Sequence, residues 1–392
     1  MFRIFYAEKD ATLYEGFDTT NTGLDEILEI GKRLGNDGST LLKSRALVKF
    51  DMSEVTNVIS KYGVNINQAK FILQLYTTHA KNLPADFTLE SRLVAQPWIN
   101  GTGYLTSTPL ISNGVQWVKP MASWSLDLQT GSLWISSSQQ IQIAGTSLYV
   151  SGSGAGGSWL WQSGSGVFNT SSFDSSYFYQ PGLDLNEPFI YRPTDIYLDV
   201  TEGIKIWISG SGGASIENNG FILKFSDENE ADDTITGYIN YFSRETHTIY
   251  VPKLIMYWDD FTYISTLSAA DLESYTVYTK LKPEYKDTEI IKLRIYTRDK
   301  YPQKSPTNLF PLQTVKRLPA TTYYSILDAA TDEVIIPYDD IYTKVSCDNT
   351  SNYIYIDMNG FMPERYYRLQ FKIKDGFTEQ FVDDDVYFKV VR

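Results

Sequence analysis

Short runs of aromatic and β-branched residues, separated by Gly, Ser, Asn and Asp, recur along this chain and constrain its fold most. In the run SRALVKFDMSEV at residues 44–55, Ala46, Val48 and Phe50 share one face, as alternate side chains of a strand do. The run QAKFILQLYTTHA at residues 68–80 alternates in the same way. Aromatic residues make up 15% of the chain, and tyrosine, the commonest of them, suits pleated, half-buried surfaces. The sequence therefore predicts an all-β fold.

The length of 392 residues is sufficient for two or three domains, each with its own core. The strand-like patterning pauses in DDFTYISTLSAADLESY, directly after Trp258. We therefore expect an N-terminal domain at residues 1–258, a linker at residues 259–274 and a C-terminal domain at residues 275–392. The C-terminal part holds five or more strand-like runs at the spacing of a β-sandwich.

Charge and apolar patterning exclude several classes of partner. The net charge of -13 and the pI near 4.7 argue against nucleic acid, because phosphate recognition needs a basic surface. No apolar run approaches the roughly 20 residues that cross a bilayer, which argues against a membrane partner. Cys347 is the single cysteine, so no intrachain disulfide is expected. The start MFRIFYAEKD lacks the pattern of a signal peptide, and we expect synthesis in a reducing cytosol.

The segment NGFMPERYYRLQFKI at residues 359–373 resembles the tyrosine corner of immunoglobulin-like domains. A loop and Pro363 lead into Tyr366 and Tyr367, and an alternating strand follows. In such a corner a tyrosine hydroxyl satisfies a backbone group where the chain crosses between sheets. We expect one of the two tyrosines to do this and the other to face outward, so the C-terminal domain is predicted to be an immunoglobulin-like β-sandwich.

The segment VTEGIKIWISGSGGASIENNGFILKF at residues 200–225 predicts a helical turn, a Ser/Gly loop and a strand. Ile204 and Trp207 share one face of the helical turn and are expected to close one end of a β-sandwich. Gly220 ends an Asn-Asn-Gly turn that starts the strand. A sugar-stacking role for Trp207 is the alternative to this structural interpretation.

Residues 128–173 carry no charge, and their centre, SGSGAGGSWLWQSGSG at residues 151–166, is rich in Gly and Ser. One interpretation is a flexible surface loop. The other is an aromatic-tipped loop that holds a protein partner or a sugar, because tryptophan rings offer a large apolar area at low entropic cost. Four tryptophans are therefore candidate exposed contacts for a glycan or a partner. They are Trp98, Trp117, Trp159 and Trp161.

The sequence offers little for catalysis. The only histidines, His79 and His247, neighbour no Ser or Cys motif, so a nucleophilic triad has no evident base. Two histidines also cannot form a three-histidine zinc site. Carboxylates are plentiful, but most of them lie at predicted turns, where Asp51 and Asp199 are expected to cap the backbone. We expect no catalytic residue, no enzyme activity and no cofactor.

The acidic run SDENEADD at residues 226–233 is the one weak candidate for a metal site. Calcium prefers clusters of oxygen ligands, and the run supplies Asp227, Asn229, Asp232 and Asp233. Their spacing matches no EF-hand loop, so the favoured interpretation is a solvated turn without metal.

Six motifs occur in a fixed order across the first part of the chain: SRALVKFDMS, AKFILQLY, QPWING, YLDVTEGIKIWISG, NNGFILKF and PKLIMYW. Together they resemble the DNRLRE-type module, a β-sandwich similar to carbohydrate-binding modules. The resemblance implies a jelly-roll-type sandwich at residues 1–258. The insert at residues 151–166 departs from the pattern of that module.

The chain as a whole is similar to virion structural proteins of contractile-tailed bacteriophages, especially those of marine cyanobacteria. The similar segments are RIFYAEKDATLYE, NTGLDEILE, YFSRETHTIYVPKLIMYWDD, MNGFMPERYYRLQFKI and YFKVVR. This resemblance implies a non-enzymatic particle component that is made in the host cytoplasm. Its expected place is the neck, collar or tail, as a symmetric ring of copies with other virion proteins as partners. A glycan-binding adhesin that attaches to host glycans is the alternative.

Overall fold

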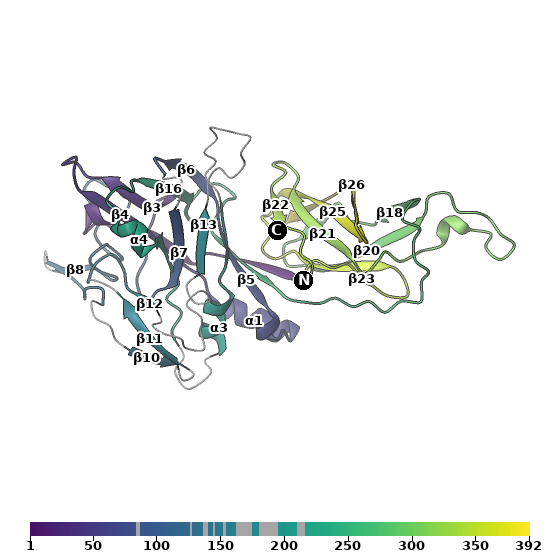
Figure 1. Ribbon diagram of the computed structural model, residues 1–392, viewed down its shortest axis with the longest axis horizontal. Coiled ribbons are helices and arrows are strands. Elements are labelled where there is room, and N and C mark those ends of the chain that lie inside the picture. Colours follow the sequence, from purple (N-terminus) through teal and green to yellow (C-terminus); the bar gives the residue numbers. More distant parts are fainter. Residues whose placement is uncertain are drawn as a thin grey trace. The chain divides into compact units, whose positions relative to one another are not determined.

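The computed structural model describes residues 1–83, 87–125, 128–135, 140–143, 146–151, 154–161, 175–179, 195–209 and 216–392 (Figure 1). In these residues the chain is mostly β, with several antiparallel sheets and few helices, so the all-β prediction is confirmed at the level of fold class. No helix of the described residues is long and apolar enough to cross a membrane.

The chain divides into two units. We call residues 5–255 the N-terminal unit, and residues 1–4 together with 256–392 the C-terminal unit. The first four residues belong to the C-terminal unit because Phe2 packs edge-to-face on Phe361, with 5.8 Å between ring centroids, and Arg3 binds Asp357 at 2.8 Å.

The segment 259–274, predicted as a linker, is instead part of the C-terminal unit. The backbone N–H of Ile264 donates to the carbonyl of Cys347 at 3.0 Å, and the N–H of Ala270 donates to the carbonyl of Arg317 at 2.9 Å. Isolated parallel β-bridges of this kind produce no regular alternation of apolar and polar residues. The sequence of this segment therefore looks like an interruption of the strand pattern.

Two sheets dominate the N-terminal unit, and of the smaller one residues 2–4 and 256–257 are counted with the C-terminal unit. The larger has eight strands in the order β13-β7-β15-β4-β3-β16-β6, with β2 paired to β4, and the smaller has the order β1-β17-β5-β14. The larger sheet consists of β2 (Lys9–Tyr14), β3 (Ile27–Leu34), β4 (Leu41–Lys49), β6 (Thr77–Lys81), β7 (Phe87–Leu93), β13 (Ser175–Tyr179), β15 (Phe221–Phe225) and β16 (Gly237–Phe242). The smaller consists of β1 (Phe2–Tyr6), β5 (Lys70–Leu75), β14 (Ile196–Asp199) and β17 (Lys253–Tyr257).

Short elements complete this unit. The remaining strands are β8 (Ser123–Ser125), β9 (Leu128–Thr130), β10 (Gln140–Ile143), β11 (Thr146–Ser151) and β12 (Trp159–Trp161), and the helices are η1 (Glu15–Phe17), α1 (Met52–Tyr62), η2 (Ile66–Gln68), α3 (Thr201–Ser209) and α4 (Asp227–Ala231). The run at residues 44–55 is a strand only as far as Lys49. Asp51 then accepts a hydrogen bond from the N–H of Ser53 at 2.8 Å and caps α1, as its expected capping role requires.

The central strands of the larger sheet are buried on both faces. All five residues of β15 are buried, and so are Ala46, Leu47 and Val48 in succession along β4. A sheet that packs on one side only would expose every second residue. Leu47 and Ile222 are neighbours in the β4–β15 register, and both belong to one cluster of buried apolar residues. The larger sheet therefore needs an apolar cover on the face that carries these two residues.

Trp207 lies in the core and Gly220 lies in the turn before β15, as the sequence predicts. Trp207, on α3, is buried and its ring centroid lies 4.9 Å from that of Phe221. Gly220 has φ +85, and a Cβ there would lie 2.5 Å from the carbonyl oxygen of Val48. Only glycine fits such a close approach of two strands in this backbone conformation.

The C-terminal unit has two further sheets, of four strands in the order β18-β20-β24-β23 and of five strands in the order β19-β26-β25-β21-β22. From Tyr366 to Lys374 of β25 buried and less buried side chains alternate, as predicted. The strands are β18 (Tyr275–Thr279), β19 (Glu284–Lys286), β20 (Ile290–Asp299), β21 (Thr322–Asp328), β22 (Val334–Ile336), β23 (Ser346–Cys347), β24 (Asn352–Asp357), β25 (Arg365–Asp375) and β26 (Thr378–Val391), with the single-turn helix η3 (Pro311–Gln313).

Substitution of Trp207 by Ala is expected to lower the free energy of unfolding by about 3–5 kcal/mol, because it removes a buried aromatic side chain and leaves a cavity. Urea unfolding followed by circular dichroism measures the change. Leu34→Ala, at a side chain that is 57% exposed at the end of β3, is the control and should cost less than about 0.5 kcal/mol. Equal stability of the two variants would show that Trp207 does not carry the packing of α3.

Candidate functional site

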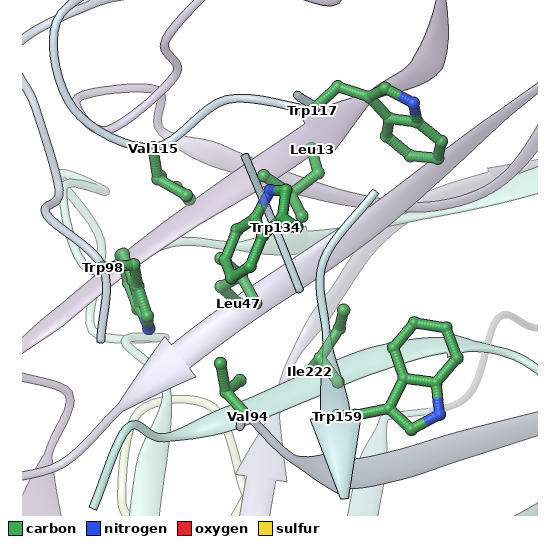
Figure 2. Packing of buried hydrophobic residues seen from close by; sticks show 10 residues of the cluster. Leu13, Leu47, Val94, Trp98, Val115, Trp117, Trp134, Trp159 and Ile222 are labelled. Atoms are coloured by element: carbon green, nitrogen blue, oxygen red, sulfur yellow. The ribbon is translucent and has the colours of Figure 1, made fainter. Parts of the chain in front are cut away.

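Three of the tryptophans that were expected to be exposed lie together in a buried cluster (Figure 2). Trp98 is 2% exposed, and Trp117 and Trp159 are each 7% exposed, so the prediction that they form an open contact surface is wrong. The side chain of Trp161 lies outside the described residues. With Trp134, the rings pack on Ala11, Leu13, Leu47, Val94, Val115 and Ile222.

This cluster is the apolar cover of the larger sheet. Figure 2 shows the rings gathered around side chains of β2, β4 and β15, and of these β4 and β15 are the central strands whose other face is already buried. Two of the indole groups are satisfied inside the protein, since Nε1 of Trp98 donates to the carbonyl of Asn219 at 2.8 Å and Nε1 of Trp134 donates to that of Gln116 at 3.0 Å. Burial with a satisfied N–H is the usual arrangement of a structural tryptophan.

The described part of the Gly/Ser-rich stretch packs against this cluster, and residues 156–160 are buried. These residues are therefore neither a flexible surface loop nor an exposed, aromatic-tipped loop, as the sequence had suggested. The N–H of Gly156 donates to the carbonyl of Trp117 at 2.5 Å. A Cβ at Gly156 would lie 2.7 Å from a guanidinium nitrogen of Arg45 and 2.8 Å from the Trp117 ring. Glycine is needed here because the loop passes directly over these two side chains.

A buried network of charges lies beside Trp159. Arg45 binds Glu230 through two hydrogen bonds, of 2.9 and 2.6 Å, and the fully buried Lys224 lies 3.6 Å from the same carboxylate. Both cations also face the Trp159 ring, at 5.1 Å for Arg45 and 5.2 Å for Lys224. Buried charges are tolerated when they are paired and hydrogen-bonded, so the network joins β4, β15, α4 and the loop before β12.

The residues of the candidate calcium loop bind protein groups. Asp227 accepts a hydrogen bond from Lys224 at 2.7 Å, and although burial raises the pKa of Asp227, the lysine outweighs it and holds that pKa below its usual value. Asn229 Oδ1 accepts from the N–H of Thr88 at 2.8 Å, and Asp232 accepts from Thr234. Asp233 is exposed.

The run 226–233 is therefore not a simple solvated turn. It forms α4, which begins after the capping residue Ser226, and it buries Glu230 in the charge network. Among the described residues no group of three or more His, Cys, Asp or Glu is arranged to hold a metal ion.

In the C-terminal unit the two corner tyrosines divide their roles as predicted. Tyr367 is 3% exposed and its hydroxyl donates to the carbonyl of Met362 at 3.1 Å, while Tyr366 is 56% exposed. Burial raises the pKa of Tyr367 well above its usual value. Tyr367 thus satisfies a loop carbonyl and leaves the neighbouring ring free to face solvent.

Tyr366 borders a shallow pocket of about 390 Å³ on this unit. The pocket is lined by Asp328, Ala329, Ala330, Glu364, Arg365, Tyr366 and Tyr387. Arg365 Nε donates to Asp328 at 2.6 Å. Burial alone raises the pKa of Asp328, but the hydrogen bond from Arg365 and two from backbone N–H groups hold that pKa below its usual value.

The pocket offers two exposed phenol rings beside a fixed ion pair and the carboxylate of Glu364, which binds Lys389. Such a set can hold a small ligand that has an apolar face and hydroxyl groups, the face against a ring and the hydroxyls on the charged groups. The sequence carries a partial signal, because one of Tyr366 and Tyr367 is expected to face outward. Tyr387 and Arg365 were missed, since nothing in the local pattern shows that β25 and β26 bring them together.

The two histidines lie apart. His247 is exposed, with Nε2 at 3.5 Å from Glu26, and His79 lies on β6 opposite Asn240. The ring of His79 is tilted against that of Tyr238, with 6.3 Å between centroids. Both are therefore surface or strand-edge positions in the N-terminal unit.

No protein-family model and no curated protein matches the chain. Among solved structures, the adhesin domain of Epf from Streptococcus pyogenes aligns with a TM-score of 0.17 and 7% identity, over 97% of this chain and 91% of that chain. A β-glucuronidase from Parabacteroides merdae aligns with a TM-score of 0.16 and 9% identity, over 100% of this chain and 36% of that chain. Neither alignment carries an argument about fold or function.

Substitution of Tyr367 by Phe is expected to lower the free energy of unfolding by about 1–2 kcal/mol, because it leaves the Met362 carbonyl without its hydroxyl donor. Tyr366→Phe removes the same atom from an exposed ring and should leave stability unchanged within about 0.5 kcal/mol. Urea unfolding of both variants gives the comparison. Two equal effects would contradict the corner role of Tyr367.

Proposed function

We propose that this chain is a non-enzymatic structural component of a tailed-phage virion, present in many copies at the neck, collar or tail. The whole-length resemblance to virion structural proteins of contractile-tailed phages supports this proposal. The proposed partners are further copies of the chain and other virion proteins. The proposed location is the virion, after synthesis in the host cytoplasm.

The observation that carries the proposal is the apolar surface of the C-terminal unit. Among the described residues, this unit exposes more large apolar side chains than the longer N-terminal unit does. Those that are more than half exposed are Ile264, Tyr301, Leu309, Phe310, Leu312, Ile341, Tyr366, Phe377 and Phe381. Four of them lie within residues 301–312, and exposed apolar groups that gather in one segment are typical of interaction surfaces.

The finer architecture belongs to the same proposal. The eight-stranded and four-stranded sheets of the N-terminal unit support a jelly-roll-type sandwich similar to carbohydrate-binding modules. The four-stranded and five-stranded sheets of the C-terminal unit, with the Tyr367 corner, support an immunoglobulin-like sandwich. Two rigid sandwiches in tandem suit a protein that joins or decorates parts of a particle.

Gold-conjugated antibodies against the purified chain should label particles of the phage that encodes it. Label confined to the neck, collar or tail is the expected result, and antibody absorbed with the purified chain is the control. Particles that stay unlabelled, both intact and after mild opening with urea, would overturn the virion assignment.

A second candidate function is glycan binding at the pocket between Tyr366 and Tyr387. The observation in its favour is the pair of exposed rings beside Glu364 and the Arg365–Asp328 ion pair. We place the proposed site here and not at the tryptophans, because the described tryptophan rings are buried. Host surface glycans are the proposed ligand class.

Binding to a panel of immobilised saccharides tests this candidate. Tyr366→Ala should reduce binding at least about tenfold, which corresponds to the loss of one aromatic contact. Tyr301→Ala removes an even more exposed tyrosine of the same unit, outside the pocket, and should leave binding unchanged. Absence of binding by the unmodified chain, or equal loss in the two variants, would contradict a glycan site in this pocket.

A further inference from the structure

Residues 298–317, which we call the basic loop, differ in charge from the rest of this acidic chain. The loop contains five basic residues and one acidic residue, and no carboxylate occurs from residue 300 to residue 327. Lys316 pairs with Asp299 at 2.8 Å, and this pair cancels in charge. Arg298, Lys300, Lys304 and Arg317 remain and give the loop a net positive charge.

The basic loop is ordered and presents apolar side chains to solvent. Asn308 holds it together, since its N–H donates to Ser305 and its side-chain amide donates to Thr314 at 2.8 Å. Pro311 is buried and anchors η3. The side chains that this frame leaves exposed are Tyr301, Leu309, Phe310 and Leu312. An ordered loop that exposes four large apolar groups has the composition of an interface and not of a solvated turn.

A second surface of the same unit has the opposite charge. Residues 375–385, which we call the acidic hairpin, comprise the end of β25, the turn and the first part of β26, and contain five acidic residues and no basic residue. Phe377 at its tip is fully exposed, and Phe381 is 65% exposed. Of its carboxylates, Glu379 lies 3.6 Å from Lys374 and Asp383 lies 3.7 Å from Arg368.

We propose that the basic loop of one copy binds the acidic hairpin of the next copy, so that the C-terminal units associate head to tail. The two surfaces are complementary in charge, and each presents large apolar side chains that its own unit leaves exposed. Charge complementarity steers the encounter and sets the register, while the buried aromatic groups supply most of the affinity. This inference rests on the proposed function, which requires many copies of the chain in one assembly.

The association uses two different surfaces and is therefore heterologous. Such contacts form a closed ring when the rotation between neighbours closes, and an open filament when it does not. Each copy contributes one basic loop and one acidic hairpin, so every internal copy has two neighbours. A second copy fits the basic loop because the remainder of the chain is strongly acidic.

Charge reversal on each side tests the proposal. One variant carries Lys300→Glu, Lys304→Glu and Arg317→Glu, which takes the basic loop from a net charge of +4 to -2. The other carries Asp375→Lys, Glu379→Lys and Asp383→Lys, which takes the acidic hairpin from -5 to +1. Sedimentation velocity of the full chain gives the distribution of assemblies at about 25 mM and about 500 mM NaCl, because salt screens exposed charges. The unmodified chain should associate at low salt and dissociate toward the 44.6 kDa monomer at high salt.

Each reversed variant alone should associate at least about tenfold more weakly than the unmodified chain. An equimolar mixture should recover the assemblies, because the acidic loop of the first variant then meets the basic hairpin of the second, and the basic loop of the second meets the acidic hairpin of the first. Recovery also shows that both variants are folded. Lys280→Glu with Lys282→Glu and Lys286→Glu, the same change of charge as in the loop variant at exposed sites outside both surfaces, should behave as the unmodified chain does.

Three results would overturn the inference: an unmodified chain that stays monomeric at low salt, reversed variants that assemble as it does, and a mixture that fails to recover assembly. Phe310→Ser tests the apolar part and should weaken association without a change in melting temperature, since Phe310 is exposed. Gold label on the particle together with a chain that does not self-associate would leave the virion proposal standing and reject only the head-to-tail contact.

Discussion

The buried ion pair between Arg45 and Glu230, with Lys224 beside it, is the interaction on which the N-terminal unit depends. It joins β4 to α4 and, through Arg45, reaches the carbonyl of Gly156 in the loop before β12. Removal of one member of such a network leaves an uncompensated buried charge, which typically costs about 3–5 kcal/mol. This one network contacts and positions the acidic run, the glycine-rich loop and the ring of Trp159.

The network explains how the larger sheet is covered on its second face. Its central strands are apolar on both sides, and on one side a loop with the tryptophan cluster supplies the cover. The aromatic side chains that stood out in the sequence are consequently used for packing. The proposed binding surfaces lie instead on the C-terminal unit. They are the Tyr366 pocket, the basic loop and the acidic hairpin.

In the C-terminal unit β25 alternates between buried and less buried side chains, while every residue of β21 is buried. A corner tyrosine closes one loop through a hydrogen bond to Met362. Phe377 and Phe381 lie at outward positions and are more than half exposed, although the ring of Phe381 also meets that of Tyr338 edge-on, with 6.0 Å between centroids. Their exposure is therefore informative about partners in a way that the buried tryptophans are not.

The sequence by itself determined the β class, the corner formed by Tyr367 and the core position of Trp207, because each depends on local alternation or on a short motif. It did not determine the environment of Trp98, Trp117 and Trp159. Their burial depends on which loop lies over which strand, and that pairing joins residues far apart in the chain. Tertiary structure also decided that residues 259–274 belong to a unit and that Tyr366 and Tyr387 share a pocket, since long-range hydrogen bonds and strand register leave no periodic mark in the sequence.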